Sequence, residues 1–149
     1  MVFKLQTSLT LDKAEAITAF ALETAGQKSF LPMAVVVLDA GGNVVLSKRQ
    51  DGCGVLRLDV AYAKAWGALG MGLPTGTIGA RMRDNPNFVT SLVAASKGRL
   101  APNPGGVLIL NENEEAIGAV GMSGDTGPND EICAIAGVEA SGYRAAGTE

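Results

Sequence analysis

A β-hairpin in the first third of the chain is the feature that most constrains the fold. Residues 32–39 (PMAVVVLD) and residues 44–51 (VVLSKRQD) are two runs rich in β-branched side chains. The four residues between them, AGGN, are typical of a tight turn. We therefore predict an antiparallel β-hairpin over residues 32–51.

A second hairpin and several helices are predicted in the rest of the chain. Residues 107–110 (VLIL) and 116–124 (AIGAVGMSG) flank the acidic turn NENEE and predict a second pair of strands. Apolar residues at helical spacing predict helices within residues 8–29, 54–72 and 128–147, and two short helices joined by turns within residues 73–96. Thr10 is the expected N-cap of the first helix. Two hairpins sheathed by helices favour an α+β fold with an antiparallel sheet over a doubly wound parallel sheet.

Length and charge narrow the function classes. The 149 residues fit one domain, residues 1–149, because two domains would each be too small to bury a core. No stretch approaches the about 18 consecutive apolar residues of a membrane span, so we expect no membrane partner. The first residues lack the sustained apolar region of a secretory signal, which favours a cytoplasmic location. The net charge is −3 with dispersed Lys and Arg, which argues against a nucleic-acid partner.

The chain contains no histidine, which removes much of the usual chemistry of active sites. Without it there is no Ser-His or Cys-His nucleophile pair and no histidine ligand for zinc or haem. The two cysteines, Cys53 and Cys133, lie far apart and have no metal-ligand spacing, so we expect no metal site. Proton transfer, if any occurs, falls to Asp, Glu, Lys, Tyr or Cys.

The glycine-rich segment IGAVGMSGDTGPNDE offers three interpretations. It matches neither the dinucleotide fingerprint GxGxxG nor the phosphate loop GxxxxGK[ST]. Asp125, Asp130 and Glu131 crowd the predicted start of the last helix, where an anion would need free N–H groups, so a strand-to-helix turn is favoured over a phosphate site. As a third reading, Ser123, Asp125 and Thr126 form the lip of a pocket. Asp125 could then accept a proton if burial raised its pKa.

Two other groups of charged residues are candidates for a site. Arg99 lies between Gly98 and the bend PNPGG, and an arginine on a restricted backbone can clamp a carboxylate; the alternative is an exposed surface charge. Asp59 and Lys64 are five residues apart rather than four, so each is expected to meet some other partner. Lys64 could act as a base or a Schiff-base nucleophile, or could lie along the surface with its charge in water.

Four segments, taken in order, resemble a known family. VVVLDAGGNVV, DVAYAKA, PGGVLI and IGAVGMSGDTGPNDEICAIAG are similar to the GlcG/HbpS family of haem-degrading or haem-binding domains, to which the C-terminal domain of PduO-type proteins also belongs. The resemblance spans residues 9–142. It implies a profilin-like α/β sandwich with a central antiparallel sheet of about five strands, helices on both faces, and a homo-oligomer from dimer to octamer.

The resemblance also implies haem binding for some members of the family. Haem-binding relatives ligate iron through histidine, so no residue here is assigned as a haem ligand and no cofactor is firmly implied. Genes of the family often accompany the catabolism of small acids and aromatics, which suggests a small-molecule ligand.

Three functional hypotheses follow. The first is a small-molecule-binding protein whose pocket lies at the glycine-rich end of the sheet. Its expected ligand-binding residues are Asp59, Arg99, Gly105, Gly106, Ser123, Gly124, Asp125 and Thr126. The second is a cofactor-free lyase, isomerase or hydratase in which Arg99 holds a substrate carboxylate, Asp125 or Lys64 moves a proton, and Ser123 bonds an oxyanion. The third is a non-catalytic scaffold subunit.

Overall fold

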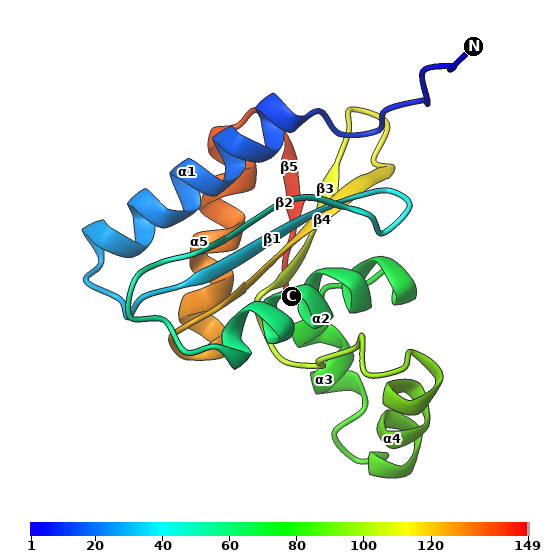
Figure 1. Ribbon diagram of the computed structural model, residues 1–149. Coiled ribbons are helices and arrows are strands. Elements are labelled where there is room, and N and C mark those ends of the chain that lie inside the picture. The colour runs from blue at the N-terminus through cyan, green and yellow to red at the C-terminus, as the bar shows by residue number, and fades with distance from the viewer. Residues whose placement is uncertain (149) are drawn as a thin grey trace.

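A five-stranded antiparallel sheet forms the centre of the molecule. The computed structural model describes residues 1–148. The strands are β1 (Ala34–Asp39), β2 (Val44–Arg49), β3 (Gly106–Leu110), β4 (Ala116–Ser123) and β5 (Arg144–Ala146). Their order across the sheet is β2-β1-β4-β3-β5, and every neighbouring pair is antiparallel (Figure 1).

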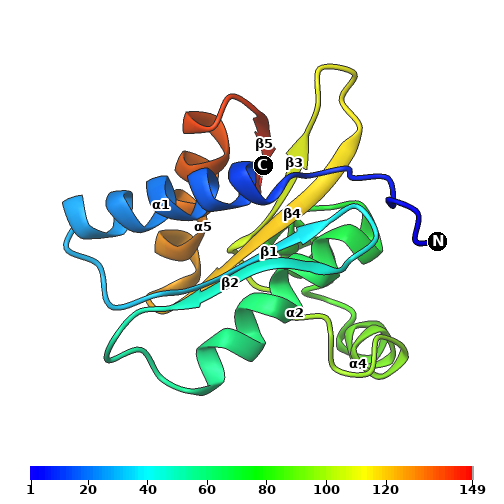
Figure 2. The same ribbon diagram turned by 45° about the horizontal axis from the view of Figure 1, so that its top comes forward.

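Helices cover both faces of this sheet. They are α1 (Leu11–Gln27), α2 (Leu56–Met71), α3 (Thr75–Arg81), α4 (Pro86–Ala95) and α5 (Gly127–Ala140). The helices α1 and α5 pack together on one face, while α2 lies on the other (Figure 2). The short helices α3 and α4 follow α2 on its side of the sheet, and α4 lies outermost (Figure 1).

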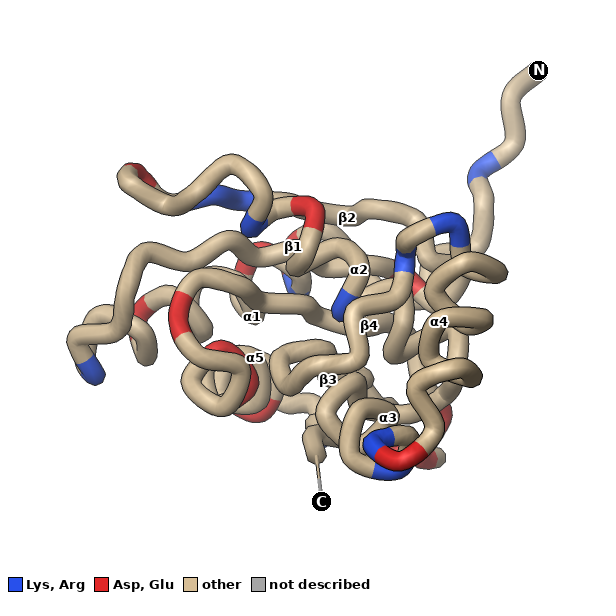
Figure 3. The backbone as a smooth tube through the Cα atoms, turned by 90° about the horizontal axis from the view of Figure 1, so that it is seen from below, with Lys and Arg blue, Asp and Glu red and all other residues tan. Residues whose placement is uncertain are grey.

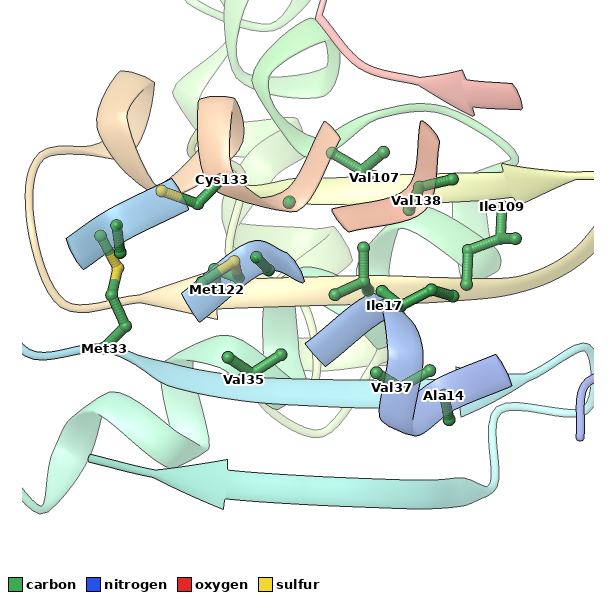
Figure 4. Packing of buried hydrophobic residues seen from close by; sticks show 14 of the residues in the cluster. Ala14, Ile17, Met33, Val35, Val37, Val107, Ile109, Met122, Cys133 and Val138 are labelled. Carbon is green, nitrogen blue, oxygen red and sulfur yellow. The ribbon is translucent and has the colours of Figure 1, made fainter. Parts of the chain in front are cut away.

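The core has two parts, one on each face of the sheet. Along β1 the side chains alternate: Val35 and Val37 join the cluster under α1 and α5, whereas Val36 and Leu38 join the cluster under α2. Figure 4 shows the first cluster, with Ile17 of α1 and Val138 of α5 facing the valines of the sheet. Each fully buried Val or Leu side chain contributes roughly 1.5–3 kcal/mol to stability. Burial on both faces explains why β1 is apolar at every position before Asp39 rather than alternating with polar residues.

Local sequence signals explain where the helices begin and how closely they pack. Thr10 caps α1 by accepting a hydrogen bond from the Lys13 amide (3.3 Å), as predicted. Thr126 caps α5 in the same way, with Pro128 in the first turn. On the other face α2 lies so close to β4 that a side-chain carbon at Gly121 would overlap the carbonyl of Ala61, so this position requires glycine.

The fold class and both hairpins are confirmed, and so are the two short helices in residues 73–96. The prediction of one closing helix over residues 128–147 is wrong at its end. The helix stops at Ala140, and Gly142 adopts a left-handed conformation (φ 88°) that reverses the chain. Residues 144–146 then pair with β3 as the edge strand β5. Within residues 1–148, no helix is both long and apolar enough to cross a membrane.

Candidate functional site

A cavity of about 350 Å³ lies at the end of the sheet where β4 turns into α5. We call it the strand-end pocket. Its walls come from α2, from the loop before β3 and from the turn between β4 and α5. The lining residues are Arg57, Val60, Lys64, Asn103, Pro104, Ser123, Asp125, Gly127, Pro128 and Asp130. Basic and acidic residues are interspersed along the backbone (Figure 3). The charge that a ligand would meet therefore depends on the residues that line the pocket.

A buried ion pair forms one side of the pocket. The Nζ atom of Lys64 donates to Oδ2 of Asp130 (2.9 Å) and to the carbonyl oxygen of Met122 (2.9 Å). The two charged side chains are 4% and 1% exposed. Because Lys64 belongs to α2 and Asp130 to α5, the pair joins the helical layers on opposite faces of the sheet.

The carboxylate of Asp130 is held from both sides. Its Oδ1 atom accepts a hydrogen bond from the amide of Asp125 (2.9 Å), while Oδ2 faces Lys64. Burial raises the pKa of Asp130 above its usual value, and the Lys64 charge and the Asp125 amide oppose this rise. Asp130 is therefore the partner of Lys64, for which the sequence predicted only some partner other than Asp59.

Two glycines make room for the ion pair. Gly105 has a positive φ of 121°, and a side-chain carbon there would lie 2.9 Å from Nζ of Lys64 and 2.9 Å from the carbonyl oxygen of Met122. A carbon at Gly106 would overlap the Lys64 carbonyl and the Thr75 hydroxyl. Neither glycine lines the strand-end pocket, although both were expected to bind ligand. They shape the pocket indirectly, by letting Lys64 pass close to the backbone.

Asp125 stabilises the turn at the lip of the pocket. It accepts hydrogen bonds from the Leu31 amide (2.9 Å), the Thr126 amide (2.7 Å) and the side chain of Asn129 (2.8 Å). These bonds, those of Leu31 and Thr126 first, lower the pKa of Asp125 below its usual value. A role as proton acceptor depended on a raised pKa, which this residue does not have. Thr126 is occupied as the cap of α5, and Gly124 packs against the backbone of Pro32 and Met33.

Arg57 lines the strand-end pocket, although it is not among the residues predicted from the sequence. Its Nη1 atom donates to the Oγ atom of Ser123 (3.2 Å) in the pocket wall. Within residues 1–148, the structure has ion pairs only between Lys64 and Asp130 and between Arg144 and Glu114, so Arg57 has no carboxylate within ion-pair distance there. Arg57 precedes Lys64 by seven residues, or two helical turns. This spacing puts both cations on one face of α2 and could have identified Arg57 from the sequence.

Arg99 and Asp59 do not join the site. The guanidinium of Arg99 stacks over the ring of Trp66, with 3.9 Å to the ring centroid, and its Nε atom donates to the Ser96 carbonyl (2.8 Å). The loop before β3 reaches the pocket through Asn103 and Pro104 instead. Asp59 is exposed on α2 and is not among the lining residues. The structure thus brings together Lys64, Ser123 and Asp125 of the predicted residues, and adds Arg57 and Asp130.

The lining residues do not fit an iron-ligating haem site. Histidine, cysteine thiolate, methionine and tyrosine are the usual protein ligands of haem iron, and none of these residue types lines the strand-end pocket. The amine of Lys64, which could also ligate iron, lines it but is held by Asp130 and the Met122 carbonyl. Both cysteines are buried elsewhere, and burial raises the pKa of Cys133 to about 11, which keeps it a neutral thiol. Among residues 1–148 no group of three His, Cys, Asp or Glu side chains could hold a metal ion.

The donors in the pocket suit an anionic or oxygen-rich group. Lys64 uses two of its three N–H donors on Met122 and Asp130, and the Ser123 hydroxyl accepts from Arg57 while its own hydrogen has no partner among residues 1–148. The planar guanidinium of Arg57 can form two parallel hydrogen bonds to one carboxylate. The same wall therefore offers one unpaired cation and two further donors.

Comparison with known proteins places this architecture in a family. The model of the family described as "Haem degrading protein HbpS-like" matches residues 9–139. A 15.0 kDa protein from the dhaT-dhaS intergenic region of Citrobacter freundii is 31% identical over 121 residues, which cover 81% of this chain and 80% of the relative.

Solved structures show the same fold. The Klebsiella pneumoniae protein ORFY superposes with a TM-score of 0.81 at 27% identity, covering 95% of this chain and 96% of that one. The PduOC:heme complex superposes with a TM-score of 0.81 at 24% identity, covering 91% and 96%, and at this identity it supports the fold alone. From the family match over residues 9–139 and the Citrobacter relative, the chain belongs to the HbpS-like family.

Proposed function

We propose that this protein binds a small organic molecule through a carboxylate in the strand-end pocket. The observation that carries the proposal is the contrast between its two cations. Lys64 is neutralised at 2.9 Å by Asp130, whereas Arg57 faces the same cavity with the neutral Ser123 hydroxyl as its hydrogen-bond partner and no carboxylate within ion-pair distance among residues 1–148. A ligand carboxylate would supply the missing counter-charge.

Neither acidic residue of the pocket forms an ion pair with Arg57. Asp130 is engaged by Lys64 and by the amide of Asp125, and Asp125 is engaged by three N–H donors. The charge of Arg57 also lowers the pKa of both carboxylates, but as the smallest of the causes that act on them, and Arg57 donates no hydrogen bond to either. The volume of about 350 Å³ lies at the lower end of the range of ligand pockets, which favours a small ligand.

A tetrapyrrole is a second candidate ligand, and membership of the HbpS-like family favours it. Tetrapyrroles such as haem carry propionate side chains, so Arg57 would contact a carboxylate in this case as well. Because Lys64, the one lining residue that could ligate iron, is engaged by Asp130 and Met122, we propose contact through a propionate and derive no step at the metal. The family resemblance also supports a homo-oligomeric state, and we include a cytoplasmic location in this proposal.

The cofactor-free enzyme receives less support than a binding protein. It required a proton acceptor beside the bound carboxylate, but the pKa of Asp125 is lowered and Lys64 is engaged in an ion pair. Arg99, the expected carboxylate clamp, lies on Trp66 outside the pocket. Binding needs only the donors that the pocket presents.

Calorimetric titration with benzoate, propionate and their uncharged amides tests the proposal. We expect saturable binding of at least one acid and none of its amide, and a loss of about tenfold or more in affinity for Arg57→Gln, because a hydrogen-bonded charge is removed. Arg99→Gln is the matched control and should bind as the parent protein does. Equal affinities for acid and amide, or an unchanged Arg57→Gln, would overturn the carboxylate assignment.

A further inference from the structure

The helix α4 is the least supported element of the fold. Its sequence, PNFVTSLVAA, contains no charged residue, yet none of its residues is buried within the part of the chain that the structure describes, residues 1–148. It packs extensively against no other helix or strand there. An isolated helix shorter than about 12–15 residues is only marginally stable in water, because most helices gain their stability by packing an apolar face. The ten residues of α4 therefore need a further partner.

An apolar groove lies between α4 and α2. We call it the α4 groove, and its volume is about 200 Å³. Its lining residues come from α2, from α4 and from the residues that follow α4: Trp66, Gly67, Gly70, Met71, Leu92, Ala95, Ser96 and Leu100. None of them carries a charge, and none lines the strand-end pocket. An apolar side chain placed in this groove would leave water and would connect α4 to α2.

The first seven residues of the chain, MVFKLQT, have side chains that suit this groove. We call them the N-terminal arm. They belong to no helix or strand, and all of them are exposed, Phe3 by 78% and Leu5 by 89%. In an extended segment successive side chains point to opposite sides, so Met1, Phe3 and Leu5 share one side. The polar residues Lys4 and Gln6 lie on the other, which leaves one apolar side for packing.

The arm and the groove lie at opposite ends of the same molecule. The base of the arm is fixed by Leu9, which is buried, and by Ser8, whose Oγ atom accepts a hydrogen bond from the Ala40 amide (2.9 Å). From there the arm leaves the top of the molecule in Figure 1, whereas α4 lies at the bottom. An arm directed away from its own groove can reach the groove of another copy. Two antiparallel copies related by a twofold axis would exchange their arms, because such an interface is self-complementary.

We propose that the α4 groove receives Phe3 from the N-terminal arm of a second copy of this chain, with Met1 and Leu5 of the arm along α4. The area is sufficient for a stable pair. A buried aromatic side chain removes about 150–250 Å² from water, and a buried Met or Leu side chain about 60–120 Å². With the groove surface included, two exchanged arms bury roughly 1,100–1,900 Å², against about 1,200–2,000 Å² for a typical stable interface. This inference rests on the homo-oligomeric state proposed above and names one of its interfaces.

Sedimentation velocity over a range of protein concentrations tests the interface. We expect dimers or larger even-numbered oligomers of the parent protein. Phe3→Ser in the arm and Leu92→Asn in the groove should each weaken association about tenfold or more, because a polar side chain replaces a buried apolar one. Leu31→Ser is the matched control, since Leu31 is exposed but belongs to neither surface, and it should associate as the parent protein does.

Disulfide formation shows whether the arm binds another copy or its own chain. Cys53 and Cys133 are both buried, so a cysteine added at the surface is the reactive one. Chains with Leu5→Cys and chains with Ala95→Cys, one of them tagged, are mixed and oxidised, and we expect a disulfide between the two kinds of chain. Leu31→Cys in place of Ala95→Cys is the control and should react little. In the double variant Leu5→Cys/Ala95→Cys, a disulfide formed mainly within one chain would overturn the exchange of arms.

The outcomes separate this inference from the proposals on which it rests. Oligomers that persist unchanged in Phe3→Ser and Leu92→Asn would overturn the interface alone, and the homo-oligomeric state would stand. A parent protein that stays monomeric would overturn both. Neither result bears on the strand-end pocket, which the titrations with carboxylates test separately.

Discussion

Lys64 and Asp130, 66 residues apart in the chain, meet at 2.9 Å in the interior and connect the two helical layers around the end of the sheet. Both charged groups are buried away from water. Each is therefore stabilised by the other, Lys64 also by the Met122 carbonyl and Asp130 also by the Asp125 amide. Ion pairs of this kind are costly to break from one side, because the remaining charge stays buried.

Removing one member of this pair should destabilise the protein strongly. For Lys64→Met or Asp130→Leu alone we expect a loss of about 3–5 kcal/mol in the free energy of unfolding, measured by urea denaturation at pH 7. The double variant should recover part of this loss, since no lone charge remains. Glu114→Gln is the control, because the exposed pair with Arg144 should contribute only about 0–1 kcal/mol. Single variants no weaker than this control would contradict the buried pair.

Adding one methyl group at Gly105 should be enough to disturb the site. Gly105→Ala combines a positive φ with a contact of 2.9 Å to Nζ of Lys64, and we expect a loss of about 2 kcal/mol or more in chemical denaturation. Gly26→Ala is the matched control, because it lies in α1 with nothing within 4 Å of the added carbon. That variant should be neutral or stabilised by up to about 1 kcal/mol. Similar effects at both positions would show that Gly105 is not constrained.

The lowered pKa of Asp125 should produce a stability difference that depends on pH. Below the usual Asp pKa of 3.8, the folded carboxyl remains ionised while the unfolded one takes up a proton, so stability falls as the pH falls. The contribution of Asp125 is therefore complete above pH 3.8 and disappears as the pH falls through the folded pKa. The difference in the free energy of unfolding between the parent protein and Asp125→Asn should therefore shrink as the pH is lowered from pH 6 to pH 2. A gap that stays constant over this range would be inconsistent with the three hydrogen bonds.

Haem titration should distinguish ligation of iron from contact through propionates. Since no histidine, cysteine, methionine or tyrosine lines the strand-end pocket and Lys64 is paired with Asp130, we expect no sharp Soret shift that saturates at one haem per chain. Weak binding that is reduced in Arg57→Gln would agree with propionate contact. A sharp and saturating Soret shift would instead require a ligand such as tyrosine, methionine or cysteine elsewhere in the chain.

Most of the fold was predictable from the sequence because its signals are local. The hairpins follow from β-branched runs around turn residues, and the α1 cap follows from Thr10. The edge strand β5 was missed because it is three residues long and only three residues separate it from the end of α5, so no break in the helical pattern marks its start. Its position depends on pairing with β3, which no local pattern indicates.

The site was predictable only in part, because it is built from contacts between distant segments. Ser123 and Asp125 were identified because they lie in a conspicuous turn, and Lys64 because it is a charge on an apolar helix. The partnership of Lys64 with Asp130 depends on how α2 and α5 pack around the sheet, and Arg57 lies in the pocket for the same reason. Arg99 was misplaced because the loop before β3 turns its side chain onto Trp66.

The order of strands also bears on how copies of the protein can associate. One edge of the sheet is β5, which offers only three residues, and the other is β2, which ends in Lys48 and Arg49. A short edge strand and a basic edge strand both disfavour pairing with an edge strand of another chain, which is a common route to aggregation. We therefore expect a homo-oligomer of this chain to assemble through helix and loop surfaces, leaving its sheets discontinuous from one copy to the next.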